Sequence, residues 1–306
     1  MVAPVSLTQE TSTNPTHPQR PGINLAFVRL ALRAGARVLI ADLKLLPEAE
    51  ELVANSKGNA FFMKCDVSNW QDLEAIPSSV TQAFGKDAVA DIWVPGAGVF
   101  EPKWSSFFYD TETDHYKTLQ INTEHPIKLT GIAMRSCLGV NKPCVVLLTS
   151  SIAGLVGNYG AALYSASKHA IIGFTKSMAQ VDVDENVKVA CICPGIVKTP
   201  LWTGDDAKHV ASQYSYNDDI AISAEDVAEA MMDMVQSAKW SGGSIMELSK
   251  AGQRKVESVR SEDAAEQLLA ARGVGPEGVK MWRDTMDAPM REVWKKERGV
   301  VTNTKA

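Results

Sequence analysis

The stretch Tyr164-Ser165-Ala166-Ser167-Lys168 decides how this chain is interpreted. Residues 160–179 are predicted to be helical, so the spacing places Tyr164 and Lys168 on one helical face, one turn apart. A free tyrosine has a pKa of about 10, and a neighbouring ammonium group stabilises the phenolate and lowers that pKa. The pair is therefore suited to proton transfer near neutral pH. Taken alone, the same spacing also fits an exposed tyrosine beside a solvated lysine.

The run CVVLLT at 144–149 precedes this helix and predicts a buried strand. Ser151 follows at the carboxyl end of that strand, the edge where doubly wound sheets bind ligands. Its hydroxyl could hydrogen-bond a substrate oxygen as charge develops there, and the neighbouring Ser150 is the competing assignment. The next predicted strand, at 187–193, stops at Pro194-Gly195 on the same edge.

Strands and helices alternate along the rest of the chain. Apolar runs at 37–42, 60–64, 91–94 and 244–248 predict further strands, with helical segments between them. These segments include a long helix over about 114–138 and a helix at 223–235, where Ser223 and Asp226 form a variant of a capping box. Crossovers of this length force parallel pairing, and continuous apolar strands indicate a sheet covered on both faces. We expect the α/β class: a single doubly wound parallel-sheet Rossmann-type domain at 22–250, a flexible leader at 1–21, and a helical C-terminal extension at 251–306. The extension has two helix-like pieces, at 261–272 and at about 276–298.

The start of this domain departs from the pattern. Residues 9–18 (QETSTNPTHP) hold no apolar run and contain two prolines, so they are not a buried parallel strand. The first strand is therefore expected to be degenerate or missing, and residues 2–7 (VAPVSL) could substitute only with a long loop behind them. A misplaced exon boundary and a genuine truncation would each explain the loss.

Composition excludes several function classes. The net charge is −5 without a basic block, which argues against a nucleic-acid partner. The sequence holds no apolar run of membrane-spanning length and no signal-peptide pattern, so we expect a cytoplasmic protein without a membrane partner. The cysteines lack a second pair at zinc-ligand spacing, which predicts buried free thiols and no metal site. They are Cys65, Cys137, Cys144, Cys191 and Cys193.

The strings TSSIAG, YSASKHAIIGFTKS and CICPGIVKT together resemble the short-chain dehydrogenase/reductase family over residues 22–248, and within it members similar to 15-hydroxyprostaglandin dehydrogenase. The resemblance implies an NAD- or NADP-dependent oxidoreductase that interconverts a secondary alcohol and a ketone, and a homodimer or homotetramer. It assigns Tyr164 as general acid/base and Lys168 as the residue that lowers its pKa and holds the nicotinamide ribose. Ser151 would orient the substrate oxygen, and Asn122 would support a water path to the lysine.

The resemblance also implies a cofactor site. Besides Tyr164 and Lys168, its residues are Gly22, Ile23, Asp42, Asp66, Val67, Gly98, Val197 and Thr199. An acid at position 42 can bind both ribose hydroxyls of NAD and repel a 2′-phosphate, so NAD is expected. Arg20 and Arg37 keep NADP possible, and the alternative for Asp42 is a strand-terminating turn residue.

Two family motifs are altered. The glycine loop T-G-x-x-x-G-I-G keeps only Gly22-Ile23, and Asn24, which replaces its last glycine, is expected to be tolerated because its side chain can point to solvent. The motif N-N-A-G is replaced by Pro95-Gly96-Ala97-Gly98. The glycines let the backbone approach the pyrophosphate at a helix N-terminus, so their loss supports an alternative function. That alternative is a non-catalytic binding or scaffold protein with impaired dinucleotide binding.

Aromatic residues flank the predicted site and favour a bulky, apolar small-molecule substrate, with secondary metabolism as one such context. They are Phe100, Trp104 and, within a predicted lid at 201–222, Trp202, His209, Tyr214 and Tyr216. Packing of the loop onto the core is the alternative. The C-terminal extension carries an apolar stripe, for which we expect core packing or an oligomer contact. Its members are Trp282, Met286, Met290 and Trp294.

Overall fold

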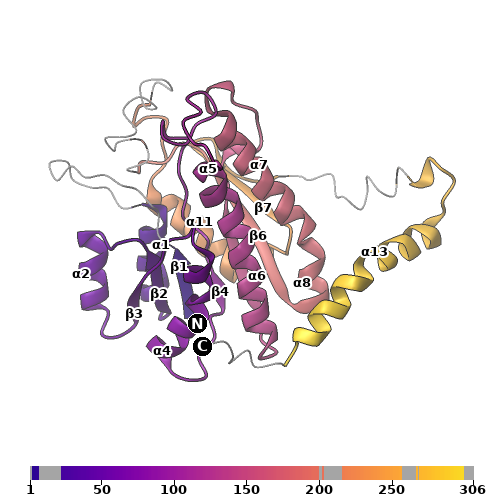
Figure 1. The fold of residues 1–306 in the computed structure, drawn as a ribbon, viewed down its shortest axis with the longest axis horizontal. Coiled ribbons are helices and arrows are strands. Elements are labelled where there is room, and N and C mark those ends of the chain that lie inside the picture. Colours follow the sequence, from indigo (N-terminus) through magenta and orange to yellow (C-terminus); the bar gives the residue numbers. More distant parts are fainter. Residues whose placement is uncertain are drawn as a thin grey trace.

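A parallel β-sheet with helices on both faces forms the centre of the protein (Figure 1). The computed structural model describes residues 2–6, 22–199, 202, 216–256, 267 and 269–299, with side chains described from residue 22 onward. The strands are β1 (Val2–Ser6), β2 (Arg37–Asp42), β3 (Ala60–Lys64), β4 (Ile92–Trp93), β5 (Cys144–Thr149), β6 (Val187–Pro194), β7 (Ile245–Ser249) and β8 (Gly252–Lys255).

The strands form two hydrogen-bonded groups, ordered β1-β2-β3 and β4-β5-β6-β7-β8. The groups meet where β1 lies beside β4, so the spatial order across the sheet is 3-2-1-4-5-6-7 (Figure 1). Pairing is parallel between these neighbours within each group. The predicted doubly wound fold is therefore confirmed. Strand β8 is an addition: it pairs antiparallel with β7, although the sequence predicted only helical pieces beyond residue 250.

The first strand is present, which corrects the expectation that it is missing. Residues Val2–Ser6 pair in register with Arg37–Ala41 of β2. They lie within the predicted flexible leader, and residues 7–21 fall outside the described part of the chain. Pro4 made this segment a poor candidate for a central strand. It is tolerated in a strand that has its hydrogen-bonded ladder with β2 on one side.

The helices cover the two faces as separate layers (Figure 1). One layer holds α1 (Ile23–Arg33), α2 (Pro47–Asn55) and α11 (Ala224–Gln236), with α1 packed on α11. The other holds α3 (Trp70–Glu74), α4 (Ile76–Phe84), α6 (His125–Leu138), α7 (Ala162–Ser177) and α8 (Ala179–Glu185). Helix α11 begins with the predicted capping box, in which Ser223 and Asp226 exchange hydrogen bonds.

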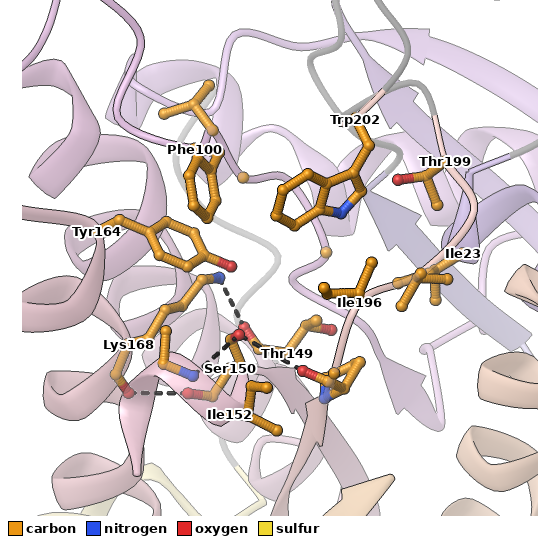
Figure 2. A pocket seen from close by; sticks show the side chains of 18 of the residues that line it. Ile23, Phe100, Thr149, Ser150, Ile152, Tyr164, Lys168, Ile196, Thr199 and Trp202 are labelled. Carbon is orange, nitrogen blue, oxygen red and sulfur yellow. Dashed lines mark hydrogen bonds between the residues drawn. The ribbon is translucent and has the colours of Figure 1, made fainter. Parts of the chain in front are cut away.

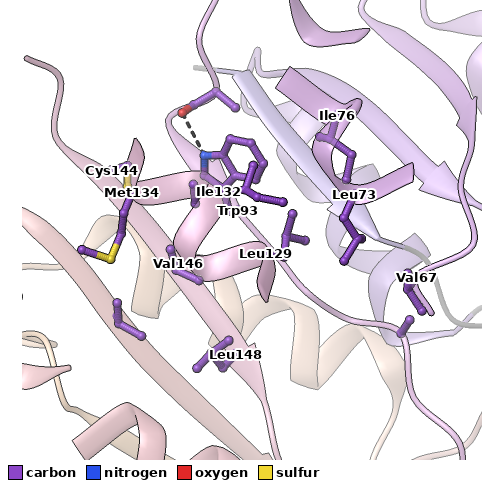
Figure 3. Packing of buried hydrophobic residues seen from close by; sticks show 14 of the residues in the cluster. Val67, Leu73, Ile76, Trp93, Leu129, Ile132, Met134, Cys144, Val146 and Leu148 are labelled. Atoms are coloured by element: carbon purple, nitrogen blue, oxygen red, sulfur yellow. Dashed lines mark hydrogen bonds between the residues drawn. The ribbon is translucent and has the colours of Figure 1, made fainter. Parts of the chain in front are cut away.

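Alternate residues of each strand supply the cores on the two faces. In β5, Val146 and Leu148 face the α6 side, whereas Leu147 joins the opposite cluster. Trp93 of β4 is fully buried on the α6 side among Leu129, Val146 and Leu148 and donates its Nε1 hydrogen bond to the Ala90 carbonyl at 3.1 Å (Figure 3). The five cysteines are free and buried, as predicted.

The helix predicted over 114–138 is interrupted. The structure has a short helix α5 (Lys117–Leu119), a π-helical turn η1 (Gln120–Glu124), and then α6. Pro126 lies in the first turn of α6 and has no N–H to donate, which explains why the regular hydrogen-bond pattern restarts there. Asn122 lies inside the π-helical turn, a feature that is frequent at functional sites.

Helix α13 (Pro276–Glu297) extends away from the body at its N-terminal end (Figure 1). Its C-terminal end attaches through Trp294, which joins the core, and through an ion pair from Arg291 to Asp184 at 2.9 Å. Core packing is thus wrong for the rest of the apolar stripe, because Trp282, Met286 and Met290 are exposed. Most of the helix predicted at 261–272 lies outside the described residues.

Within the described ranges, no helix has the length and apolar character required to cross a membrane. The same ranges contain no cluster of His, Cys, Asp and Glu side chains that could hold a metal ion.

Candidate active site

A cavity of about 220 Å³ lies at the carboxyl edge of the sheet, between the ends of β4, β5 and β6 and the start of α1 (Figure 2). It brings together residues that the sequence analysis had assigned to both catalysis and cofactor binding. Those that line it are Gly22, Ile23, Gly98, Ser151, Tyr164, Lys168, Val197 and Thr199. Asn122, Asp42, Asp66 and Val67 are not part of its lining.

Tyr164 and Lys168 occupy successive turns of α7 on the face toward the sheet, as their spacing predicts. Lys168 Nζ lies 5.6 Å from the centre of the Tyr164 ring. The same Nζ donates a hydrogen bond to the Thr149 carbonyl at 3.0 Å, which holds the lysine at the end of β5 (Figure 2). Both side chains are buried, which limits their conformational freedom.

Burial dominates the proton affinities of this pair. It raises the pKa of Tyr164 to about 12, while a hydrogen bond with Ser151 acts in the opposite direction. Burial also lowers the pKa of Lys168 to about 8. The predicted role of Lys168 in lowering the tyrosine pKa remains a prediction, because burial is the largest influence on Tyr164 in the protein without cofactor.

The choice between Ser150 and Ser151 follows from their partners. Ser150 Oγ donates to the Lys168 carbonyl at 2.8 Å and ties β5 to α7. Ser151 lies at the N-cap of a 3₁₀ turn, η2 (Ile152–Gly154); its Oγ bonds Tyr164 and donates to the Pro194 carbonyl at 3.4 Å. Ser151 is therefore the serine that can share a substrate oxygen with the tyrosine, whereas Ser150 braces the helix.

Asn122 braces the loop after β4 against the catalytic helix. Its side chain is buried, accepts from Val99 N and donates to Val99 O, both at 2.9 Å. It also donates to Ser167 Oγ at 3.1 Å, one residue before Lys168. A Cβ on Gly98 would lie 3.4 Å from Asn122 Oδ1 and 3.7 Å from Lys168 Nζ, so Asn122 sits close to the lysine. The predicted water path through Asn122 remains a prediction.

The other half of the site begins at α1, whose N-terminus faces the cavity. Gly22 is its N-cap, and the first turn carries neither an acidic residue nor a side-chain cap bond. Backbone N–H groups at such a helix start are suited to a phosphate. Asp42 ends β2 with 5% of its surface exposed, and burial raises the pKa of its carboxyl to about 7. Cys65 N bonds the Asp42 carbonyl at 2.8 Å and links this edge to Asp66 and Val67.

The two altered motifs meet at Asn24 and Gly96, where one motif has an asparagine in place of glycine and the other a glycine in place of asparagine. Asn24 is 2% exposed, which corrects the expectation that it points to solvent. A Cβ on Gly96 would lie only 2.1 Å from Asn24 Nδ2. At position 96 this chain has a glycine where the family motif has an asparagine. The side-chain amide of Asn24 occupies the space beside that glycine. The altered sites compensate each other in volume, and both line the cavity.

A row of neighbouring aromatic rings, from Tyr164 to Tyr216, lies along the cavity. The Phe100 ring lies 4.4 Å from Tyr164 and 5.3 Å from Trp202, and Trp202 stacks on Tyr216 at 5.6 Å. Phe100 and Trp202 line the cavity, as the sequence predicted (Figure 2). Trp104 is exposed and is not part of the lining. The other predicted lid residues, His209 and Tyr214, lie outside the described part of the chain.

These features together fit a dinucleotide. An uncapped helix start, glycines at Gly22 and Gly98, and a buried acid at the end of β2 are arranged along one edge of the sheet. No sequence motif revealed one buried acid beside the site, Glu101, which accepts a hydrogen bond from Tyr164 N. Its position directly after the apolar run that follows β4 was the available signal.

Comparisons with known proteins agree with this geometry. A family model for short chain dehydrogenases matches residues 19–209. Relatives include 3beta-hydroxysteroid dehydrogenase 2 of Eggerthella lenta, 30% identical over 185 residues that cover 60% of this chain and 70% of that protein. The 15-hydroxyprostaglandin dehydrogenase (NAD(+)) of Rattus norvegicus is 32% identical over 210 residues, or 65% and 73% of the two chains. Momilactone A synthase of Oryza sativa subsp. japonica is 29% identical over 180 residues, covering 59% and 64%.

Proposed function

The chain belongs to the short-chain dehydrogenase family, and on that premise we propose that it interconverts a bulky, apolar secondary alcohol and its ketone, with NAD as the preferred cofactor. It is an oxidoreductase that acts on CH–OH groups with NAD or NADP. The observation that carries the finer proposal is the convergence of Ser151, Tyr164 and Lys168 in one cavity beside the start of α1.

In this proposal Tyr164 exchanges the proton. During oxidation, the hydroxyl proton of the substrate passes to the Tyr164 phenolate as the C–H hydride leaves, and reduction reverses both transfers. When bound in the cavity, a nicotinamide would accept or supply this hydride. Ser151 shares the substrate oxygen with Tyr164, and its hydrogen bond lowers the tyrosine pKa against the effect of burial. Lys168, held by the Thr149 carbonyl, places a positive charge under the ring.

Asp42 supports NAD over NADP. Its buried carboxyl can accept from ribose hydroxyls and, when ionised above its pKa of about 7, would repel a 2′-phosphate. Arg37, which had kept NADP open, lies at the other end of β2 and donates to the Phe84 carbonyl at 3.0 Å, away from that ribose position. Arg20 lies outside the described residues.

The aromatic row supports the substrate class. Phe100 and Trp202 present apolar surface next to the Tyr164 hydroxyl, where a large apolar skeleton would exclude water from the reacting carbon. The names of two relatives specify a hydroxysteroid and a hydroxyprostaglandin, both secondary alcohols on extended apolar frameworks. A terpenoid or polyketide alcohol of secondary metabolism is the same chemical class.

We also propose a cytoplasmic homodimer or homotetramer. The free, buried thiols fit a reducing compartment, and the exposed apolar stripe of α13 is available for an oligomer contact. Sedimentation of wild type and of a Trp282→Glu variant would test the assembly: an oligomer that uses the stripe dissociates in the variant, and an unchanged mass contradicts that contact.

The test of the activity is cofactor titration followed by a screen of secondary alcohols and ketones. Tyr164→Phe should bind NAD as wild type does and lose activity by about 10³-fold, because only the proton-transfer group is removed. Wild-type alcohol oxidation should keep rising with pH above pH 8, since a Tyr164 pKa raised to about 12 keeps phenolate scarce there.

Unchanged turnover in Tyr164→Phe would exclude this mechanism. A folded wild-type protein that binds neither NAD nor NADP would instead favour the alternative of a non-catalytic scaffold. The altered glycine loop still supports the scaffold alternative, although its residues before Gly22 lie outside the described part of the chain. The argument from a missing first strand no longer supports it, because that strand is present at Val2–Ser6.

A further inference from the structure

A buried carboxylate links the catalytic helix to the loop that follows β4. Glu101 is 7% exposed and adopts a left-handed backbone conformation, with φ of 39°. A non-glycine residue in that conformation is strained, and such strain persists only where surrounding contacts enforce it. The contacts of this side chain explain why it is held there.

Both oxygens of Glu101 are used. Oε2 accepts from Tyr164 N at 3.0 Å, while Oε1 accepts from Phe107 N at 3.1 Å and Ser106 Oγ at 3.2 Å. Tyr164 N lies in the first turn of α7, where backbone N–H groups have no acceptor within the helix. The N-cap residue Ala161 provides no side-chain acceptor. Glu101 therefore caps α7 from another segment, at the amide of the catalytic tyrosine itself, with a charge that the helix dipole favours.

The same segment also contacts the tyrosine ring and the helix that leads to Asn122. Phe100 packs on the ring of Tyr164 at 4.4 Å. Ser105 is buried; its Oγ accepts from Thr118 N at 2.9 Å, and its carbonyl accepts from Thr118 Oγ1 at 2.8 Å. Thr118 belongs to α5, directly before the π-helical turn. Residues 100–107, which we call the bracket, are thus hydrogen-bonded both to α7, which carries Tyr164, and to α5, which leads to Asn122.

We propose that Glu101 is a positioning residue that sets the location of the Tyr164 hydroxyl by fixing the first turn of α7 to this bracket. The inference rests on the proposed role of Tyr164. A carboxylate is required because it accepts on both sides at once. A glutamine would point an NH₂ group at one of the donors and would lose either the helix side or the loop side of the link.

The decisive variant is Glu101→Gln, with Asp110→Asn as matched control. Asp110 lies in the same loop, also has a left-handed φ of 44°, is exposed, and accepts from Tyr116 Oη at 2.6 Å without reaching α7. Glu101→Gln should lower kcat by about 10- to 100-fold and leave the NAD dissociation constant within about twofold, because small misplacements of a reacting group are costly. Asp110→Asn should leave both within about twofold.

A pH profile separates positioning from a general loss of structure. The hydrogen bond with Ser151 lowers the pKa of Tyr164. Displacing Tyr164 weakens that bond and so raises this pKa, and the acid limb of alcohol oxidation should therefore move to higher pH in Glu101→Gln. In a Tyr164→Phe background, Glu101→Gln should cause little further loss, because it acts through the removed hydroxyl. An additive loss, or an unmoved acid limb, overturns the proposal.

Amide hydrogen exchange in the wild type provides a test that needs no variant. The Tyr164 amide should be protected about 10-fold or more relative to Leu163, also in the first turn, because only Tyr164 N donates to the carboxylate. Equal exchange overturns the proposal even if Glu101→Gln fails to fold. If Tyr164→Phe keeps full activity, the proposed function fails, whereas an inactive Tyr164→Phe with a fully active Glu101→Gln refutes only the role of Glu101.

Discussion

The catalytic half and the cofactor half of the site are built in different ways. Ser151, Tyr164 and Lys168 come from one short stretch of chain, from the turn after β5 to α7, and hydrogen bonds such as Ser150 Oγ to the Lys168 carbonyl join its two ends directly. The cofactor half combines β1, the start of α1 and Asp42 at the end of β2, and residues 7–21, which connect β1 to α1, lie outside the described part. Local assembly makes the first half visible as a motif, whereas the second half depends on pairings that no short motif records.

Removal of residues 1–6 should have the largest effect on the cofactor half. The ladder to β2 would be lost, at a cost on the order of 5 kcal/mol for the hydrogen bonds alone, and the edges of β2 and β4 would be exposed. We expect the free energy of unfolding from urea titration to fall by that order, together with NAD binding. Removal of residues 300–306, which contain no described helix or strand, is the control. If both truncations leave stability and binding unchanged, β1 is dispensable.

The exchange between Asn24 and Gly96 offers a smaller test within the cofactor half. Gly96→Ala places a Cβ 2.1 Å from Asn24 Nδ2 and must displace that amide, so it should weaken NAD binding. Asn24→Gly in the same chain should recover about 1 to 2 kcal/mol of the loss, the coupling typical of residues in contact. Gly157→Ala, where a Cβ meets nothing within 4 Å, should be neutral. Additive effects of the Asn24 and Gly96 changes would show that the sites do not compensate.

A third test concerns the pH dependence of stability at Asp42. Its pKa is raised from 3.8 to about 7, so the folded protein keeps a proton that the unfolded chain has lost, and stability falls as pH rises between these values. Asp42→Asn removes this dependence. Its stability relative to wild type should rise by on the order of 2 kcal/mol from pH 5 to pH 8 in urea unfolding.

Asp226→Asn provides the control of opposite sign. Hydrogen bonds with Ser223 lower the pKa of Asp226, so its contribution is complete above pH 5 and its removal should cost the same at both pH values. If the difference in unfolding free energy between Asp42→Asn and wild type is the same at pH 5 and pH 8, the Asp42 carboxyl does not have the raised pKa in the folded protein.

The sequence predicted the fold where a signal is continuous along the chain. Strands such as Cys144–Thr149 are apolar runs, and α11 carries its capping box in adjacent residues, so both were predictable. Strand β8 is exposed over Gly252–Lys255 and has no apolar alternation to detect. Strand β1 contains Pro4 and is far in sequence from Gly22, which hid it from a pattern search.

The site shows the same division. Tyr164 and Lys168 were predictable from spacing, but the choice between Ser150 and Ser151 depends on how the chain turns at the end of β5. The burial of Asn24 depends on contact with Gly96, which is distant in sequence. Glu101 gave no motif, since its partner lies 63 positions away at Tyr164.

The buried cysteines give this protein internal reporters of local opening. Cys65 follows β3 in the cofactor half, whereas Cys144, Cys191 and Cys193 lie in β5 and β6 of the catalytic half. A thiol reagent reaches each of them only when its surroundings unfold, so the order of modification under native conditions ranks the stability of the two halves. With mass spectrometry, that ranking can be followed as NAD is added, without introducing a label or a substitution.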